Sequence, residues 1–507
     1  MELQNDENLT RRLLKKGVRL YILTFLIAPS GYIIRVLLSH QLSVADVWVF
    51  YSVIGLMVVL TTYNDLWLTQ SLQYFLPKYF VEKKYSYLLS SVVWTLLVQL
   101  ITASCIIAFL LRWGAERLAV HHFHDISITP LLRLVAWYFL GINALEVVTS
   151  IMRSFQKIIH TKVTDAIRMW SIVGFTLYFF VVGSTNVGDY LMARIAGVRL
   201  ALLFGIVVFF TYYRPVFRQG NIVYDTGEIK RYVRYAGRIF LWANAGILFS
   251  QIDQQVIINM LWAQQAGYYS NYRSIINAVW TTLWPLISFI FPLTSELLAK
   301  NEMDKYRYLQ SVLLQYLTLV SRIMAVFVVV MAPRLISVLF GSDFAPAAEY
   351  LRFTGWFIPL TVLQGILTGL LSWAWKIRAS VLVTLIAAIF NLVSNILLIP
   401  IFWIYGVLWT TIVSWLLMCV FLIRPARKIA PITLEYGYML KSSLFSIVLG
   451  ALLRYCTTRR DAVLFVGSIY RDLFVLVVLA VLFVALHGLI NRNKIATVLA
   501  LFRSFSR

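Results

Sequence analysis

The stretch LLRLVAWYFLGINALEVVTSIMRSFQK, residues 131–157, is repeated as YLRFTGWFIPLTVLQGILTGLLSWAWK, residues 350–376, without a gap. Identical positions in the two copies include Leu132 and Leu351, Arg133 and Arg352, Trp137 and Trp356, and Lys157 and Lys376. Two shorter likenesses keep the same order, one aligning Pro77 with Pro292 and one aligning Gly188 with Gly406. The chain therefore contains an internal repeat whose copies start about 220 residues apart.

The composition places this chain in a membrane. Hydrophobic residues make up 60% and charged residues 13%, whereas a soluble domain carries about twice that charge. Apolar runs of about 20 residues, the length that crosses a bilayer as a helix, recur along the whole chain. The sequence predicts an all-α, polytopic membrane protein with about fourteen transmembrane helices. The predicted spans lie near 18–38, 47–69, 87–110, 131–152, 165–184, 189–212, 238–261, 271–295, 309–332, 349–371, 378–400, 403–424, 437–455 and 470–490.

The repeat organises these spans into two lobes. Spans one to six resemble spans seven to twelve, and an even number of spans makes both copies enter the membrane from the same side. We expect two pseudo-symmetric six-helix lobes related by an axis along the membrane normal. The predicted parts are an N-terminal lobe over 1–217, a cytoplasmic linker with a basic amphipathic helix over 218–237, a C-terminal lobe over 238–428, and spans thirteen and fourteen with a cytoplasmic tail over 429–507.

The net charge of +23 follows the predicted topology. Lysine and arginine are concentrated in the loops on one side, which predicts that both termini and these basic loops lie in the cytoplasm. Nucleic acid is therefore not the expected partner. The basic stretch RRLLKK (11–16) leads directly into span one without a cleavage site, so we expect that helix to be retained.

Span eight carries the clearest polar stripe. Its members share one helical face: Ser270, Arg273, Asn277, Trp280, Thr281, Trp284 and Ser288. Polar and aromatic side chains on one face of a membrane helix are typical of a cavity that binds sugar. The alternative for Arg273 is an interfacial arginine whose head group reaches water at the membrane surface.

The run NAGILFSQIDQQVIINMLW (244–262) places polar residues in the middle of span seven. On an unbroken helix, Asn244, Gln251, Gln255 and Asn259 form one stripe, and we expect these amides to face the cavity. Asp253 lies on the opposite side. It either pairs with a cation on a neighbouring helix or titrates during transport.

Arginines outnumber carboxylates among the other candidate cavity residues. Arg35 follows small residues in span one, which alternatively form a helix-packing face. Arg322 lies on a polar stripe of span nine. Arg194 and Arg199 point to different faces of span six, so we expect only one of them to line a cavity and take Arg194 as the candidate. Guanidinium groups form paired, charge-assisted hydrogen bonds with phosphate, so this set favours a phosphate-containing substrate.

Two more carboxylates join Asp253 as candidates for coupling to a proton or sodium gradient. Asp65 follows threonines in span two, and Glu146 shares a face of span four with Arg153. Glu146 and Arg153 are two turns apart, so they either meet through an intermediate group or find partners on other helices.

No metal or cofactor site is predicted. The outer-loop stretch HHFHD (121–125) contains three histidines, but close histidines in an exposed loop more often have no metal-binding role. The three cysteines, Cys105, Cys419 and Cys456, lack metal-binding spacing and form no obvious disulfide pair.

Several segments carry a family resemblance. They are APSGYIIRVLLSHQLSVADVWVFY (28–51), QIDQQVIINMLWAQQAGYYSNYRSI (251–275), APRLISVLFGSDFAPAAEYLR (332–352) and NLVSNILLIPIFWIYGVLWTTIVS (391–414). Together with the repeat they resemble the polysaccharide flippase branch of the multidrug/oligosaccharidyl-lipid/polysaccharide exporter superfamily. The arginine placement departs from the lipid II flippases, so lipid II is not assigned.

The resemblance implies two lobes around a central cavity, and a flippase rather than an enzyme. Such proteins move undecaprenyl-diphosphate-linked oligosaccharide across the bacterial inner membrane by alternating access, to supply lipopolysaccharide O-antigen, capsule or exopolysaccharide. We expect Arg35 and Arg273 to hold the diphosphate while the polyprenyl tail stays in membrane lipid. A polysaccharide polymerase and a chain-length protein are the expected partners.

Two alternatives remain open. A multidrug or small-molecule antiporter of the same fold predicts an acidic cavity, which the excess of arginine disfavours. A membrane polysaccharide polymerase, ligase or glycosyltransferase predicts a sizeable outer loop or soluble domain, whereas the outer loops here are short.

Overall fold

The computed structural model describes residues 23–66, 68–155, 157–261, 263–289, 297, 302–373 and 377–428, with five single positions beyond 428. Within these ranges the regular secondary structure is entirely helical. Apart from those single positions, predicted spans thirteen and fourteen lie outside the described residues. The chain divides into two compact units, Met1–Gly267 and Tyr268–Arg507.

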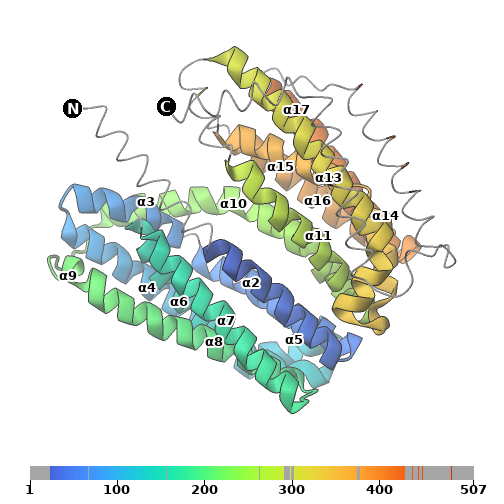
Figure 1. The fold of residues 1–507 in the computed structure, drawn as a ribbon. Coiled ribbons are helices and arrows are strands. Elements are labelled where there is room, and N and C mark those ends of the chain that lie inside the picture. Colours follow the sequence, from blue (N-terminus) through green and yellow to red (C-terminus); the bar gives the residue numbers. More distant parts are fainter. Residues whose placement is uncertain are drawn as a thin grey trace. The chain divides into compact units, whose positions relative to one another are not determined.

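The first unit contains a helix over Leu23–Gln41 and most of the labelled helices (Figure 1). These are α2 (Val44–Asp65), α3 (Leu68–Val81), α4 (Tyr85–Phe109), η1 (Leu110–Gly114), α5 (Ala115–His121), η2 (Ile126–Ile128), α6 (Thr129–Ser154), α7 (Ile158–Val182), α8 (Val187–Val208), η3 (Phe209–Tyr213), α9 (Arg214–Phe217) and α10 (Thr226–Met260). Helix α8 packs against α7, α6 and α2, and α10 packs against α2 and α3.

The second unit contains most of α11 and the helices that follow it. They are α11 (Ala263–Phe289), α13 (Met303–Phe340), η4 (Ser342–Phe344), α14 (Pro346–Gly355), α15 (Ile358–Trp373), α16 (Ile377–Phe402) and α17 (Ile404–Arg427). Helix α17 packs against both α15 and α16, and α13 packs against α14 and α15.

The predicted membrane architecture is confirmed. Each of the first twelve predicted spans corresponds to a helix or a broken helix pair, and nine described helices are long and apolar enough to cross a membrane. A tenth candidate is the bent pair α14 and α15. Helices α10 and α11 are not among them, because they carry the polar residues of predicted spans seven and eight. The number fourteen stays a prediction.

The two copies of the repeat differ in one structural respect. The first copy forms the continuous helix α6, whereas the second forms α14 and α15, which are bent by 56°. The sequence analysis expected one span over 349–371. The break precedes Pro359, which aligns with Leu140 in the first copy. Proline lacks the N–H that a helix interior requires but is tolerated in the first turn of a helix. A new helix, α15, therefore begins at Ile358, immediately before this proline.

The predicted linker and span seven form one helix. Helix α10 is unbroken from Thr226 to Met260, so the helical wheel drawn through residue 253 is valid. Asp225 caps its N-terminus by accepting hydrogen bonds from Gly227 N and Glu228 N at 2.8 and 3.3 Å. Because α10 lies in the first unit, the compact units divide at a later residue than the predicted lobes, whose boundaries stay a prediction.

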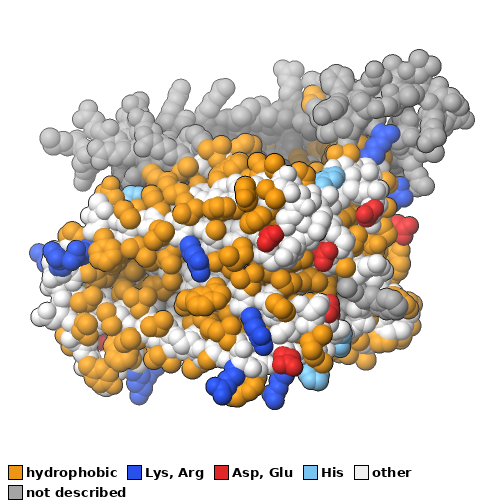
Figure 2. Space-filling model, turned by 90° about the horizontal axis from the view of Figure 1, so that it is seen from below, with side chains coloured by type: hydrophobic (Ala, Val, Ile, Leu, Met, Phe, Trp, Pro, Cys, Tyr) orange, Lys and Arg blue, Asp and Glu red, His pale blue; other side chains and the backbone are white. Residues whose placement is uncertain are grey.

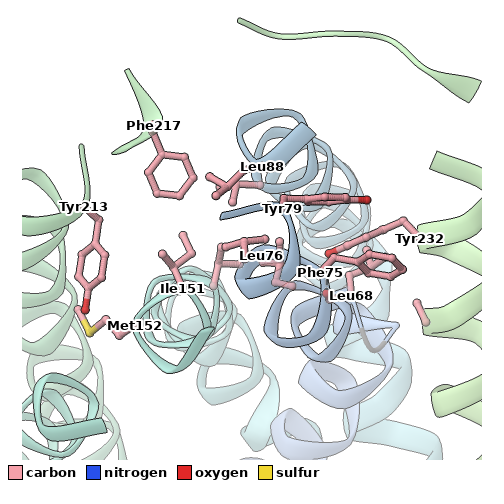
Figure 3. Packing of buried hydrophobic residues seen from close by; sticks show 14 of the residues in the cluster. Leu68, Phe75, Leu76, Tyr79, Leu88, Ile151, Met152, Tyr213, Phe217 and Tyr232 are labelled. Atoms are coloured by element: carbon pink, nitrogen blue, oxygen red, sulfur yellow. Dashed lines mark hydrogen bonds between the residues drawn. The ribbon is translucent and has the colours of Figure 1, made fainter. Parts of the chain in front are cut away.

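A buried hydrophobic cluster joins α3 to α4, α6, α10 and the segment from the end of α8 to α9 (Figure 3). Leu68, Phe75 and Leu76 of α3 occupy its centre. Ile151 of α6 and Tyr232 of α10 pack against them from either side. Burial of these side chains holds α10 to α3, and the Tyr232 hydroxyl also donates to the Leu68 carbonyl at 2.7 Å.

Apolar side chains cover most of the described face in Figure 2, with lysines, arginines and acids scattered among them. Exposed large hydrophobic residues are frequent on the long helices, among them Phe25, Val181, Leu203 and Leu397. A soluble monomer rarely exposes so much contiguous apolar surface. The surface is that of a protein surrounded by lipid.

Close packing of α7 on α8 depends on Gly197. A Cβ at this position would lie 3.0 Å from the Arg168 carbonyl oxygen and would overlap Ile172. We predict that Gly197→Val lowers stability by about 1–3 kcal/mol, because the helices must separate. Thermal unfolding in detergent measures the change. Gly174→Val on α7 is the matched control, since no other atom lies within 4 Å of a Cβ there; equal losses in both variants would contradict the prediction.

Candidate functional site

Two arginines of the first unit rest on adjacent aromatic residues of α2. The Arg35 guanidinium carbon lies 3.7 Å from the ring centre of Tyr51, and that of Arg194 lies 5.1 Å from the ring centre of Phe50. The two rings contact each other edge to face, with centres 5.1 Å apart. Three helices therefore converge: the helix Leu23–Gln41 supplies Arg35, α2 supplies the rings, and α8 supplies Arg194.

The ring faces stabilise the two cations where water is scarce. A guanidinium over an aromatic face gains about 2 kcal/mol when it is desolvated. The two arginines still repel one another, and the Nε–H of Arg194 is buried without a hydrogen-bond partner. A concentrated positive charge with an unused donor is suited to an anionic ligand with several oxygen acceptors. We call Arg35, Arg194, Phe50 and Tyr51 the arginine pair site.

The structure separates Arg194 from Arg199, as the helical wheel predicted. Arg194 is partly buried against Phe50, whereas Arg199 is exposed on α8. Gly31, one turn before Arg35, has open space around it except for the terminal methyl of Met169. Sequence reasoning found both arginines but missed Phe50 and Tyr51, because these residues look like ordinary apolar members of span two.

The predicted stripe of span eight lies on α11 in the second unit. Asn277 and Thr281 are exposed, and Arg273 and Trp280 are partly buried. Arg273 Nη1 donates to the Tyr269 hydroxyl at 3.1 Å, which holds the guanidinium along its own helix. The side chain of Trp284 lies outside the described residues. Arg322 is partly buried on α13.

Trp280 owes its position to a glycine. Its indole ring occupies the space that a side chain at Gly365 of α15 would fill. Gly365 is the repeat counterpart of Glu146, so one copy has a carboxylate at this position and the other has no side chain. The polar face of α11 is thus exposed at Asn277 and Thr281 and closed by packing at Trp280.

The amides of α10 gather near Gly55 of α2. An ideal Cβ on Gly55 would lie 3.5 Å from Gln255 Nε2 and 3.8 Å from both Gln251 Oε1 and Gln254 Nε2. The bare backbone of Gly55 leaves room for these side chains beside α2. Asn259 is exposed and Asp253 is buried, so these two residues occupy different environments as the wheel predicted.

Asp65 lies in a network of neutral hydrogen-bond donors. Its carboxylate accepts from Thr69 N at 3.2 Å, Thr69 Oγ1 at 2.8 Å and Gln99 Nε2 at 2.6 Å. Asp65 forms no ion pair with any residue that the structure describes. The Oε1 atom of Gln99 is buried and accepts no hydrogen bond, so this network has more acceptors than donors. Protonation of the Asp65 carboxylate would add a donor to it.

The neighbouring residue Asn64 links three helices. Asn64 Nδ2 donates to Asn143 Oδ1 of α6 at 2.9 Å, and Thr102 Oγ1 of α4 donates to Asn64 Oδ1 at 2.6 Å. Asn143 in turn donates to the Phe139 carbonyl at 2.7 Å. These partners of Asn64 lie 79 and 38 residues away in the chain, so helical periodicity could not identify them.

Glu146 has a direct partner. Arg153 Nη2 donates to Glu146 Oε2 at 2.9 Å, and both side chains are more than a third exposed. The sequence analysis expected an intermediate group or partners on other helices. Two long side chains can instead bridge two helical turns by reaching toward each other along the same face. Such exposed pairs contribute at most about 1 kcal/mol.

The HHFHD loop is engaged with α10. His122 Nε2 lies 3.0 Å from Gln255 Oε1, and His124 Nε2 lies 3.3 Å from the Asn259 carbonyl oxygen. Among the described residues, no group of three or more His, Cys, Asp or Glu side chains is arranged to hold a metal ion. The histidines therefore join the loop between α5 and η2 to the helix that carries the glutamine stripe.

A small cavity lies elsewhere in the first unit. It has a volume of about 60 Å³ and is lined by residues of α3, α4 and α10, including Tyr79, Trp94 and Tyr232. This space holds about two water molecules. It is too small for an oligosaccharide.

Residues 51–349 match the family described as polysaccharide biosynthesis protein. The chain belongs to this family. The resemblance inferred from the scattered motifs is thereby confirmed at the family level. An uncharacterized membrane protein of Methanocaldococcus jannaschii is 25% identical over 458 residues, which are 86% of this chain and 87% of the relative.

Solved structures with the same fold include two kinds of transporter. The lipid II flippase MurJ in an inward closed conformation matches with a TM-score of 0.73 and 14% identity, over 94% of this chain and 100% of that chain. An inward-facing MATE family multidrug resistance transporter of the MOP superfamily matches with a TM-score of 0.65 and 11% identity, over 80% of this chain and 95% of that one. This member of the polysaccharide biosynthesis protein family therefore has the fold of the MOP superfamily.

The Asn64 network supports a second stability test. We predict that Asn64→Ala destabilises the protein by about 1–2 kcal/mol, because it removes hydrogen bonds between α2 and both α4 and α6. Thr102→Val removes only the bond to α4 and is expected to cost less. Thermal unfolding in detergent compares the two variants. A larger loss in Thr102→Val would show that the link to Asn143 contributes nothing.

Proposed function

We propose that this protein is a flippase for undecaprenyl-diphosphate-linked oligosaccharide. Its substrate would be a repeat unit of O-antigen, capsule or exopolysaccharide, carried from the cytoplasmic to the outer leaflet of the inner membrane. The family membership, the MOP fold and the apolar surface support a membrane transporter in polysaccharide synthesis. Both termini are proposed to lie in the cytoplasm.

The arginine pair site is the observation that carries this proposal. A diphosphate presents two adjacent anionic groups, and Arg35 and Arg194 present two adjacent cations on one aromatic support. The Arg194 Nε–H is buried without a partner here, so opening of the site would allow it to donate to a phosphate oxygen. A small-molecule cation antiporter would place carboxylates in this position instead.

The remaining polar residues are proposed to bind the glycan. The amides of Gln251, Gln255 and Asn259 on α10 and the exposed Asn277 on α11 both donate and accept hydrogen bonds, as sugar hydroxyls require. Arg273 is proposed as a further contact to the substrate. The polyprenyl tail would remain in membrane lipid throughout, since its transfer into a polar cavity is unfavourable.

We propose alternating access as the mechanism and Asp65 as the proton site that couples it to a gradient. The carboxyl group is held by neutral donors and has a spare acceptor beside it at Gln99. Its protonation would change the hydrogen bonds that join α2 to α4. A polysaccharide polymerase, with a chain-length protein, is the proposed consumer of the translocated repeat unit.

The arginine pair site is tested by substituting Arg194. We predict that Arg194→Ala reduces transport of fluorescent undecaprenyl-diphosphate oligosaccharide about 10- to 100-fold, because a charge-assisted hydrogen bond to phosphate is lost. Proteoliposomes with a label-quenching readout measure the rate. Arg199→Ala is the matched control on the same helix, where the guanidinium is exposed. Full activity of Arg194→Ala would remove the basis of the proposal, and efflux of a cationic dye would favour the antiporter.

Coupling is tested by substituting Asp65. We predict that Asp65→Asn keeps glycan exchange in the absence of a gradient but loses the acceleration by a pH gradient, because the amide cannot take up the proton. Proteoliposomes with and without an imposed gradient separate the two effects. Asp165→Asn is the control, since Asp165 pairs with Arg168 at 3.1 Å on the partly exposed face of α7. If Asp65→Asn responds to the gradient as the wild type does, Asp65 is not the coupling residue and another carboxylate must be.

A further inference from the structure

The loop between α5 and η2 contacts the C-terminal end of α10 at two points. His122 contacts Gln255 and His124 contacts Asn259, so loop residues two apart meet helix residues four apart. The loop is a tight turn at the end of α5, closed by backbone hydrogen bonds from Phe123 N to the Leu118 carbonyl at 3.0 Å and from Asp125 N to the Ala119 carbonyl at 2.9 Å. Four residues of helix rise about 6 Å, so the two histidine contacts hold about one turn of α10.

Phe123 anchors the loop between these contacts. Its buried ring packs edge to face on Trp48 of α2 with ring centres 6.0 Å apart, and the His122 imidazole packs against it at 5.0 Å. His124 adopts a left-handed backbone conformation with φ of 54°. This conformation is unfavourable for a residue with a side chain, so the surrounding contacts must maintain it.

One hydrogen bond joins the side chains of His122 and Gln255. The amide oxygen of Gln255 meets the imidazole, while its Nε2 is buried without a partner. The loop thus joins α2, through Phe123 and Trp48, to the end of α10.

We propose that residues His122–His124 form a latch on the outer side of the membrane, which holds α10 to the rest of the first unit and which protonation of His122 releases. The latch rests on the proposed alternating access, because opening toward the outer side requires α10 to separate from this loop. The proposal assigns His122 a gating role and assigns no substrate contact to it.

The electrostatics of His122 give the direction of the response. Burial is the largest influence and lowers the pKa of its imidazole below the ordinary value of about 6.5. The charge of His124 lowers the pKa further, and the hydrogen bond with Gln255 raises it. Among the described residues, α10 faces His122 with the amide of Gln255, and the loop residue Phe123 lies between His122 and Trp48 of α2, so His124 is the titratable group that acts on it.

The difference in the pKa of His122 between the closed and the released latch determines whether acid opens or closes it. A released loop exposes His122 to water and returns its pKa to the ordinary range, so the released form binds the proton more tightly. Acidification through about pH 6.5 therefore favours release, and neutral pH favours the closed latch. Under an inwardly directed proton gradient the outer side is the more acidic one. The latch would then open toward the side on which the lipid-linked product must leave.

Hydrogen exchange of the latch loop tests this inference without any substrate. Exchange of the backbone amides of residues 119–128 is measured by mass spectrometry on the full chain in nanodiscs, at about pH 7.5 and pH 5.5, after correction for intrinsic rates. The wild type is expected to open more at acid pH, by up to about tenfold, which is the limit that a released imidazole with an ordinary pKa of about 6.5 sets between these two pH values. His122→Asn is expected to lose this response, because its amide cannot be protonated.

Two further variants keep the test decisive. His121→Asn is the matched control in the same loop and is expected to respond as the wild type does. Gln255→Glu is expected to reverse the response, because a carboxylate facing protonated His122 stabilises the closed latch at acid pH. A wild-type response in His122→Asn, or its loss in His121→Asn, would overturn the latch. A normal exchange response in a protein that moves no lipid-linked glycan would instead overturn the proposed function.

Discussion

A guanidinium group inside a membrane must find a partner, because the water that would solvate it is absent. Arg35 and Arg194 find theirs on two neighbouring rings of α2, Tyr51 and Phe50. This arrangement requires the helix Leu23–Gln41 and α8 to approach the same part of α2. The cost of leaving either charge unsolvated thus helps to fix how three helices pack, while the Nε–H of Arg194 remains buried without a hydrogen-bond partner.

The same constraint explains the neutral network deeper in the first unit. Asn64, Asn143 and Thr102 satisfy one another across three helices, so little of their hydrogen-bonding capacity remains for a substrate. The exposed side chains of Asn277 and Thr281 on α11 differ in this respect. A polar face left open on a membrane helix is suited to contact with water or a polar ligand, whereas a closed network serves packing.

The internal repeat accounts for the architecture, and the departures from it mark individual chemistry. Pro359 stands where the first copy has Leu140 and divides one long helix into α14 and α15. Gly365 stands where the first copy has Glu146, and the vacant space accommodates Trp280. A substrate without internal symmetry needs different groups from the two copies, and such replacements supply them without altering the overall helix order.

The sequence by itself determined the helices, the repeat and the stripes of polar residues, because hydropathy and helical periodicity are properties of neighbouring residues. It placed Arg194 and Arg199 on different faces and favoured Arg194 as the candidate, but it could not identify the ring on which Arg194 rests. Only the tertiary structure decided that Arg194 meets Phe50, that Glu146 meets Arg153 directly, and that the HHFHD histidines hold α10. These outcomes depend on the rotation of each helix and on side chains far apart in the chain. That information arises only when the helices pack together.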